Sequence, residues 1–266
     1  MTYKDSHPIP HYPSFMRLDG RNLIVIGAGQ GMGRQTSHAL KQCGARVVCA
    51  DIDEQLAREI AEEVGGTAVV GDMTKEANIE RLVTEASAAF GGPIHGFVDI
   101  IGIAEWEAIV ATPEAMWDRQ FDMCIRHAFL LAKHVGGHMQ ANKVPGTMVF
   151  IASVHGMTAS VRHAAYGAAK AGLISLVKTI AEEMGPDGIR ANAVAPGSIL
   201  TPRMEIALDD ATRAKAAAAS VLNVMGKTSD IASAALFLTS AQSSFITGQT
   251  LVVDGGAVVA DPFNLL

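Results

Sequence analysis

The sequence has few cysteines, no cluster of basic residues and no apolar run as long as a membrane span. Its three cysteines, Cys43, Cys49 and Cys124, are an odd number without paired spacing, which favours a reduced, cytoplasmic protein. The net charge is −6 and the 21 basic residues are scattered, so we expect neither nucleic acid nor an anionic membrane as a partner. The first residues, Met1 to Pro13, include three prolines and no apolar stretch, so we expect neither a signal peptide nor an anchor.

Apolar residues make up 49% of the 266 residues, and strand-length apolar runs alternate with helical patterns. Strands are expected near 22–27, 45–50, 67–71, 95–101, 147–152, 190–195 and 249–253. Helices are expected near 31–43, 53–64, 75–90, 112–139, 163–184 and 228–240. Helices of this length between strands imply parallel crossovers. We therefore predict the α/β class, with a Rossmann-like doubly wound parallel sheet of about seven strands and helices on both faces.

The pattern has no linker-like break and no repeat, which indicates one domain. We expect an irregular N-terminal arm over 1–16 and a single dinucleotide-binding and catalytic domain over 17–266. Residues 198–227 interrupt the alternation and are too many for an ordinary connection. A long loop above the carboxyl ends of the strands is a natural substrate lid, so we predict the lid near 198–227.

A glycine-rich turn, Gly27-Ala-Gly-Gln-Gly31-Met-Gly33, lies between the apolar run Leu23–Ile26 and a helical pattern. Glycines are needed in such a turn because a Cβ would block the approach of a pyrophosphate to the N–H groups at the helix N-terminus. The strand that follows ends at Asp51, whose carboxylate could accept hydrogen bonds from an adenosine ribose. A 2′-phosphate there would be repelled, so the sequence predicts NAD rather than NADP, although Arg46 and Arg58 would favour the phosphate.

A phenol and an ammonium group, Tyr166 and Lys170, are spaced one helical turn apart. A cation within about 4–6 Å lowers the pKa of a tyrosine by roughly one to three units, which would allow proton transfer near neutral pH. A pair with this spacing also occurs by chance in many helices. Ser153, however, follows the strand expected at 147–152, so its hydroxyl is expected at the carboxyl edge, beside the helix that bears Tyr166.

Together these residues resemble the short-chain dehydrogenase/reductase family over nearly the whole chain, in order and in spacing. The matching pieces are Gly27-xxx-Gly31-x-Gly33, Asp51, Asp72-Met-Thr74, Trp117-Asp-Arg119, Ser153, Tyr166-xxx-Lys170, Asn192-Ala-Val-Ala-Pro-Gly197, Thr201, Thr247-Gly and Asp254-Gly-Gly256.

The resemblance implies a role for each catalytic residue. Tyr166 would exchange a proton with the substrate oxygen, Lys170 would lower the Tyr166 pKa and hold the nicotinamide ribose, and Ser153 would hydrogen-bond the reacting oxygen. Hydride transfer itself belongs to the cofactor. The cofactor-binding residues implied are Gly27, Gln30, Gly31, Met32, Gly33, Asp51, Ile52, Asp72, Met73, Gly102, Tyr166, Lys170, Pro196, Gly197, Ile199 and Thr201.

Two departures from the family pattern bear on activity. Asp99-Ile-Ile-Gly102 replaces the usual Asn-Asn-Ala-Gly, which removes polar side chains that tie neighbouring strands and adds bulk beside the cofactor. Cys124 aligns where an asparagine normally serves a water-mediated proton relay. A thiol is a weak donor and acceptor. Cys124 also fits an apolar helix stripe, so packing and reactivity both remain open, with packing favoured.

Histidines invite two further hypotheses. His134 and His138 have a spacing that can ligate zinc, but two glycines lie between them and no third ligand is evident, so we expect no metal and favour a surface or subunit contact. His155 and His163, together with Met204 on the lid, are candidates for the substrate side. A simple loop role is an equal alternative for both histidines.

These observations predict an NAD-dependent oxidoreductase that interconverts a secondary alcohol and a ketone, with a small-molecule substrate. Apolar lid residues indicate a hydrophobic cyclic or aromatic substrate, although they could equally pack the lid or a subunit contact. The alternatives are a 3-oxoacyl thioester reductase and a catalytically weak dinucleotide-binding protein. Apolar residues on several faces of the helices at 112–139 and 163–184, and the apolar tail 258–266, predict a homotetramer or at least a dimer.

Overall fold

The computed structural model describes residues 8–259, which include a seven-stranded parallel sheet in the order β3-β2-β1-β4-β5-β6-β9. The chain reverses its direction across the sheet between β1 and β4, which is the switch point where ligands of such sheets bind. The strands are β1 (Asn22–Ile26), β2 (Arg46–Asp51), β3 (Thr67–Val70), β4 (Gly96–Asp99), β5 (Gly146–Ile151), β6 (Ile189–Pro196) and β9 (Thr250–Val253). The predicted fold is confirmed, with strand ends shifted by one or two residues.

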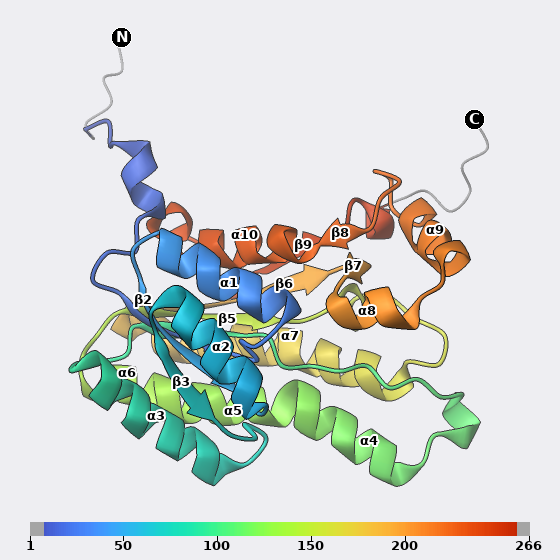
Figure 1. The fold of residues 1–266 in the computed structure, drawn as a ribbon, viewed down its shortest axis with the longest axis horizontal. Coiled ribbons are helices and arrows are strands. Elements are labelled where there is room, and N and C mark those ends of the chain that lie inside the picture. Colours follow the sequence, from blue (N-terminus) through green and yellow to red (C-terminus); the bar gives the residue numbers. More distant parts are fainter. Residues whose placement is uncertain (1–7, 260–266) are drawn as a thin grey trace.

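Helices cover both faces of the sheet (Figure 1). On one side lie α1 (Gly31–Gln42), α2 (Glu54–Val64) and α10 (Thr228–Thr239). On the other lie α3 (Glu76–Phe90), α7 (Ala164–Met184) and a long helical stretch over 114–141. This stretch joins α4 (Glu114–Phe121), α5 (His127–Leu131) and α6 (Gly137–Ala141) through wide π-helical turns at Asp122–Arg126 and Ala132–Gly136. We call Asp122–Arg126 the π turn.

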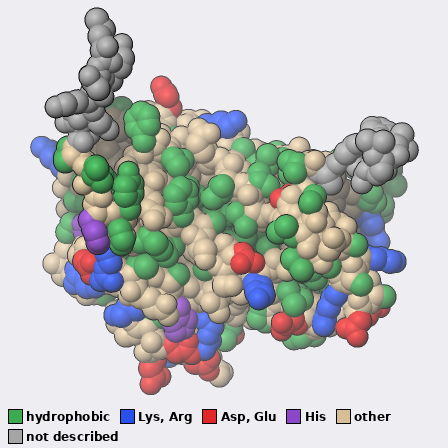
Figure 2. Space-filling model, turned by 90° about the horizontal axis from the view of Figure 1, so that it is seen from above, with side chains coloured by type: hydrophobic (Ala, Val, Ile, Leu, Met, Phe, Trp, Pro, Cys, Tyr) green, Lys and Arg blue, Asp and Glu red, His purple; other side chains and the backbone are tan. Residues whose placement is uncertain are grey.

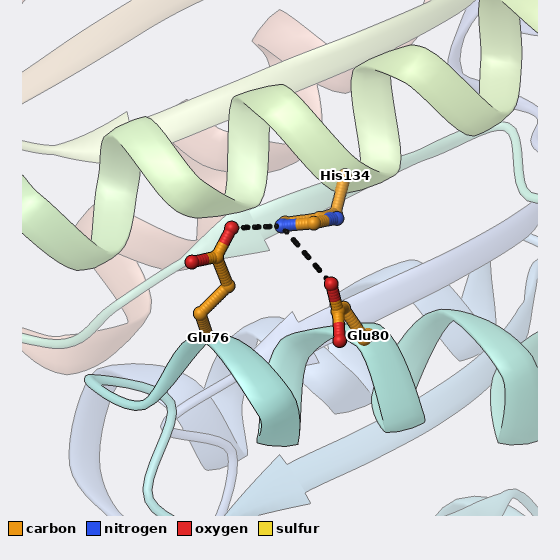
Figure 3. A group of neighbouring side chains, drawn as sticks. All are labelled: Glu76, Glu80 and His134. Carbon is orange, nitrogen blue, oxygen red and sulfur yellow. Dashed lines mark hydrogen bonds and ion pairs between the residues drawn. The ribbon is translucent and has the colours of Figure 1, made fainter.

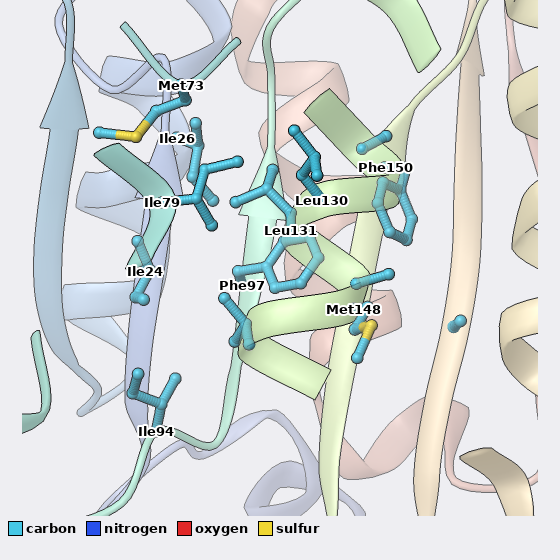
Figure 4. Packing of buried hydrophobic residues seen from close by; sticks show 14 of the residues in the cluster. Ile24, Ile26, Met73, Ile79, Ile94, Phe97, Leu130, Leu131, Met148 and Phe150 are labelled. Atoms are coloured by element: carbon cyan, nitrogen blue, oxygen red, sulfur yellow. The ribbon is translucent and has the colours of Figure 1, made fainter. Parts of the chain in front are cut away.

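Alternating side chains of each strand feed two separate cores. In β1, Ile24 packs toward α3 and the long helical stretch, whereas Val25 packs toward α1 and α10. In the first core, Phe97 and Phe150 meet edge to face with ring centroids 5.2 Å apart (Figure 4). Strands that are buried on both faces read as continuous apolar runs, which is why the sequence located them well.

Two expectations about irregular segments need correction. The predicted arm is not wholly irregular, because Tyr12–Met16 form a 3-10 helix; residues 1–7 lie outside the described part. The lid at 198–227 is mostly regular: α8 (Pro202–Ala207) and α9 (Asp210–Ala218) lie between two short paired strands, β7 (Ile199–Leu200) and β8 (Gly226–Lys227). The caps of α8 and α9 explain the difference, since the Thr201 and Asp209 side chains accept from backbone N–H groups three residues on.

Candidate active site

A groove of about 300 Å³ lies along the carboxyl edge of the sheet, where β1, β2, β3 and β4 end. It brings together many of the predicted cofactor residues, namely Gly27, Gln30, Gly31, Met32, Asp51, Ile52, Asp72, Met73, Gly102 and Thr201. The remaining lining residues are Gly71, Thr74, Ile100, Ile101, Ile103, Met123, Pro202 and Arg203. Of these, the sequence did not single out Gly71, Ile103, Met123, Pro202 or Arg203. Each is adjacent in the chain to a residue that it did single out, and this adjacency was the available signal.

The glycine turn has the shape that a phosphate-binding turn requires. Gly27 and Gly31 have φ values of +77° and +57°, which favour glycine. A Cβ at Gly33 would lie 1.9 Å from the Gly27 carbonyl oxygen, so only glycine lets α1 pack this closely on the turn. The predicted dinucleotide therefore fits the groove on backbone geometry as well as on sequence, with the start of α1 directed at the space where a pyrophosphate would bind.

The Asp51 carboxylate stands at the groove edge and is fixed on both oxygens. It accepts from the N–H of Gly29 at 2.8 Å and from the N–H of Asp53 at 3.1 Å. The two arginines that could have favoured a phosphate have other partners. Arg46 lies at the opposite end of β2 and bonds the Asn22 side chain, and Arg58 pairs with Glu54.

The three predicted catalytic residues come from two neighbouring elements. Ser153 follows β5, is 8% exposed, and its Oγ accepts from the His155 N–H at 3.1 Å. Tyr166 and Lys170 lie one turn apart on α7, with the Lys170 Nζ 5.8 Å from the centre of the Tyr166 ring. Lys170 is 2% exposed, and its ammonium donates to the Ile151 carbonyl oxygen at 2.6 Å. The structure therefore brings the predicted lysine and tyrosine together, with the ammonium buried beside the tyrosine ring.

Three rings gather near Tyr166. The ring centroids of His155 and His163 are 4.9 Å apart and lie 6.3 Å and 6.2 Å from that of Tyr166, and Trp106 packs on His163 at 5.8 Å. The His163 Nδ1 is 2.8 Å from the Val161 carbonyl oxygen, which can only accept, so Nδ1 carries a hydrogen and Nε2 is the acceptor of the neutral ring. Burial, with the neighbouring His163, lowers the pKa of His155.

The remaining predicted residues lie at the turn between β6 and the lid. Pro196 ends β6, and the Gly197 N–H donates to the Val253 carbonyl oxygen at 3.0 Å. Ile199 is buried in β7, and Met204, half-buried on α8, donates its N–H to the Thr201 hydroxyl at 3.3 Å. Residues 27–258 match a family model described as "Enoyl-(Acyl carrier protein) reductase".

The chain belongs to the short-chain dehydrogenase/reductase family. It is 36% identical to the "Short-chain dehydrogenase/reductase eriH" of Hericium erinaceus, over 88% of this chain and 96% of that one. It is 31% identical to the (3R)-3-hydroxyacyl-CoA dehydrogenase of Canis lupus familiaris, over 91% and 97%. The structure of a 7α-hydroxysteroid dehydrogenase complexed with NADH and 7-oxo glycochenodeoxycholic acid superposes with a TM-score of 0.86, at 30% identity over 92% and 96%.

Membership of this family shows the reaction class. The chain is an oxidoreductase that acts on a CH–OH group of a small molecule and uses NAD(H) or NADP(H). Among the described residues, no helix is long and apolar enough to cross a bilayer.

The first family departure proves less apolar than the sequence suggested. Asp99 is buried, but its carboxylate accepts from the Ile101 N–H at 3.2 Å and lies 2.9 Å from the His127 Nε2. Asp99 therefore keeps polar contacts at the end of β4. The expected bulk beside the cofactor groove is present, because Ile100 and Ile101 line the groove and lie 3.5 Å from the position of a Cβ at Gly27.

Cys124 lies in the π turn and is fully buried. Burial raises the pKa of its thiol, opposed by the nearby Lys170 ammonium. A Cβ at Gly102 would lie 2.8 Å from the Lys170 Nζ and 4.0 Å from the Cys124 Sγ, so both groups flank this glycine. A buried neutral thiol favours the packing interpretation over a reactive cysteine.

The two histidines of the metal hypothesis have separate partners. His134 Nε2 lies 2.8 Å from Glu76 and 4.0 Å from Glu80, both on α3 (Figure 3). The Lys133 ammonium donates to the same Glu76 oxygen at 2.6 Å and, with His134, holds the pKa of that carboxyl below its usual range. His138 Nε2 instead lies 3.3 Å from the Ile94 N–H. The His134 contacts tie the long helical stretch to α3, and the His138 contact ties it to the segment after α3. Two carboxylates thus lie near His134, which the sequence did not reveal, and His138 is not part of that group.

Proposed function

We propose that this protein is an NAD-dependent dehydrogenase that interconverts a secondary alcohol and a ketone on a hydrophobic cyclic or aromatic substrate. The observation that carries the proposal is the buried Lys170 ammonium, held by the Ile151 carbonyl and directed at Tyr166 beside a groove that ends at Asp51. We propose as its cofactor residues those predicted from the sequence.

In this proposal each catalytic side chain has one task. Tyr166 takes the hydroxyl proton of the alcohol at its Oη, or returns it to the ketone oxygen in reverse. Lys170 stabilises the phenolate form through its charge, and the Ser153 hydroxyl orients the reacting oxygen. The nicotinamide, when bound, supplies the hydride acceptor. His155, His163 and Met204 would contact the rest of the substrate.

The preference for NAD rests on Asp51. Both carboxylate oxygens accept from backbone N–H groups, and a 2′-phosphate at the ribose would meet this negative charge, while Arg58 is paired with Glu54. We expect NAD to bind at least about tenfold more tightly than NADP, or roughly 1.4 kcal/mol. Titration of both cofactors checks this. Asp51→Ala should reduce the preference, whereas equal affinities in the unchanged protein would place Asp51 away from the ribose.

The substrate class rests on exposed apolar residues in segments near Tyr166. The segments 103–110 and 157–162 are joined by a hydrogen bond from the Glu107 N–H to the Arg162 carbonyl, at 2.9 Å, and Trp106 packs on His163, which lies beside Tyr166. The exposed apolar residues of these segments and of α8 are Ile103, Trp106, Ile109, Val110, Met157, Val161 and Ile206. A panel of alcohols tests this: kcat/KM should be at least about tenfold higher for alicyclic, aromatic or steroid-like alcohols than for sugar alcohols. A preference for polyols would contradict it.

A second candidate is reduction of a 3-oxoacyl thioester. It is favoured by the similarity to a (3R)-3-hydroxyacyl-CoA dehydrogenase, whose printed name implies the reverse of this reaction. The Asp51 carboxylate and the net charge of −6 speak against NADPH and against an acidic carrier protein. Turnover of a 3-oxoacyl-CoA faster than any cyclic ketone would select this candidate. Tight cofactor binding without turnover of either would select the third, a catalytically weak dinucleotide-binding protein.

We also propose a cytoplasmic homo-oligomer, a tetramer or at least a dimer. Hydrophobic side chains are spread over the face that carries β9 and α10 (Figure 2). On it the edge strand β9 exposes Leu251, and Phe245, Val221 and Leu222 lie exposed near it. Light scattering at micromolar concentration should show an oligomer, and a monomer would refute this. Most of the apolar tail that also led to the prediction of an oligomer, from residue 260 on, lies outside the described residues. The cytoplasmic location is supported by the three cysteines, which are free thiols.

A further inference from the structure

Two ionisable side chains lie behind the groove and have no part in the proposed chemistry. Asp99 ends β4 and is 1% exposed, and His127 begins α5 and is 0% exposed. The His127 Nε2 lies 2.9 Å from the Asp99 Oδ2. Removing such a pair from water costs several kcal/mol per ion unless further hydrogen bonds satisfy its remaining atoms. A buried pair of this kind therefore has to be supported on both sides.

Hydrogen bonds do continue from both members. The Ile101 N–H donates to the Asp99 Oδ1 at 3.2 Å, so the carboxylate holds the chain that leaves β4. The His127 Nδ1 lies 3.3 Å from the Asp122 carbonyl oxygen, to which the His127 backbone N–H also donates. Since a carbonyl only accepts, the contact with Asp122 places a hydrogen on Nδ1. The pair thus links the segment 100–102 to the π turn.

Both ends of this link border the groove. Residues 100–102 form part of its wall, and Met123 of the π turn forms another part. Gly102 lies against Lys170, so this wall belongs to the catalytic end of the groove. Asp51, by contrast, lies at the carboxyl end of β2. In the sheet order, β2 is separated from β4 by β1, so Asp51 is at the other end of the groove.

We infer that Asp99 and His127 are positioning residues that set the wall of the groove for the nicotinamide half of the dinucleotide. The pair acts by fixing residues 100–102 against the π turn, and neither side chain touches the ligand. The inference rests on the proposed function in one respect, that a dinucleotide occupies this groove. It goes beyond it because it assigns a role to a buried Asp–His pair in a segment that departs from the family pattern.

The test compares a whole dinucleotide with its adenine half. Dissociation constants for NAD and for ADP are measured by calorimetry on the full chain, for the unchanged protein, Asp99→Leu and Asp99→Asn. Asp99→Leu removes the bonds to Ile101 and His127, and we expect at least a tenfold loss of NAD affinity with ADP affinity within about twofold. Asp99→Asn should stay within about threefold, because its amide can accept from Ile101 and donate to a neutral His127.

Thr147→Val is the matched control. Thr147 is a buried polar residue of the same sheet, near the opposite end, and its Oγ1 has no hydrogen-bond partner among the described residues. The near-isosteric change should leave both affinities unchanged. If Asp99→Leu fails to fold, His127→Gln is titrated with NAD and ADP in the same way. This variant breaks the link to Asp122, so we expect at least a threefold loss of NAD affinity with ADP affinity unchanged.

Two results in the variant that folds would overturn the inference. One is an equal loss of NAD and ADP affinity, and the other is no loss of either. The first result would make the pair a general stabiliser of the fold, and the second would make it irrelevant to binding. Failure of the unchanged protein to bind any nicotinamide dinucleotide is a different result, since it refutes the proposed function and the inference with it.

Discussion

Adding one methyl group at Gly102 should disable Lys170 without unfolding the protein. A Cβ there would lie 2.8 Å from the Lys170 Nζ and 3.3 Å from its Cε, whereas unstrained contacts with a carbon are about 3.5–4.0 Å. The ammonium must therefore withdraw by roughly 0.7 Å. It is 2% exposed and bonded to the Ile151 carbonyl at 2.6 Å, so it cannot move without stretching that bond.

The cost follows from the bond that is stretched. A hydrogen bond to a charged group contributes about 1.5–3 kcal/mol, and each 1.4 kcal/mol corresponds to about a factor of ten. We therefore expect Gly102→Ala to lower kcat/KM for alcohol oxidation by about 10- to 100-fold, measured from the appearance of the reduced nicotinamide. The φ of Gly102 lies outside the left-handed region, so the variant adds no backbone strain.

Gly185→Ala provides the control. Gly185 is exposed, has a right-handed helical conformation, and a Cβ there would meet nothing within 4 Å. Alanine is favoured over glycine in helical conformations by up to about 1 kcal/mol, so this variant should keep full activity and gain slightly in Tm. If Gly102→Ala retained kcat/KM within about threefold of the unchanged protein, Lys170 would not be held in place as argued.

Three further predictions concern single side chains. Tyr166→Phe should abolish turnover while NAD affinity, measured by titration, stays within a few-fold, and Lys170→Ala should damage both; retention of most of the rate in Tyr166→Phe would exclude the family mechanism. Burial raises the pKa of Cys49 to about 11. The thiol therefore ionises at a lower pH in the unfolded chain than in the folded one. The free energy of unfolding should fall between about pH 9 and pH 11, by at most about 2–3 kcal/mol. Denaturant titrations of Cys49→Ala should show a shallower fall, and an equal fall would assign it to other groups. Cys124→Ala should keep activity within about tenfold and thiol reagents should act slowly, whereas Cys124→Asn should lower turnover.

The parts of the fold that the sequence predicted are those coded by neighbouring residues. The turn Gly27–Gly33 follows directly from its glycines. Ser153 was found because it directly follows an apolar strand pattern, and Tyr166 because its spacing to Lys170 is one helical turn. The lid could also have been predicted as helical. Thr201-Pro202 and Asp209 are ordinary helix starts, with a side-chain cap at the residue before the helix and, in the first case, proline at its first position.

The π turn could not have been predicted in this way. An i→i+5 turn is rare and is stabilised here by a contact outside its own segment, the bond between His127 and Asp99 across 28 positions of the chain. The apolar stripe drawn through the helix at 112–139 assumed a uniform 3.6-residue period. Cys124, within the wide turn, is fully buried, whereas Trp117, seven residues before it, is 40% exposed.

The expected loss of turnover in Cys124→Asn follows from the surroundings of the buried thiol. Two groups flank Cys124: the Ile103 backbone, which hydrogen-bonds the thiol, and the Lys170 ammonium, which already bonds the Ile151 carbonyl. An added amide has one acceptor and an NH₂ donor group, more than the Ile103 backbone alone can pair in this fully buried space. Its remaining polar atoms would draw Lys170 away from Ile151 or stay unpaired, at a cost of about 1–3 kcal/mol. Since Lys170 borders this space, the cost should appear as lower turnover, and a substantial gain in turnover would show that the relay position is vacant rather than rebuilt.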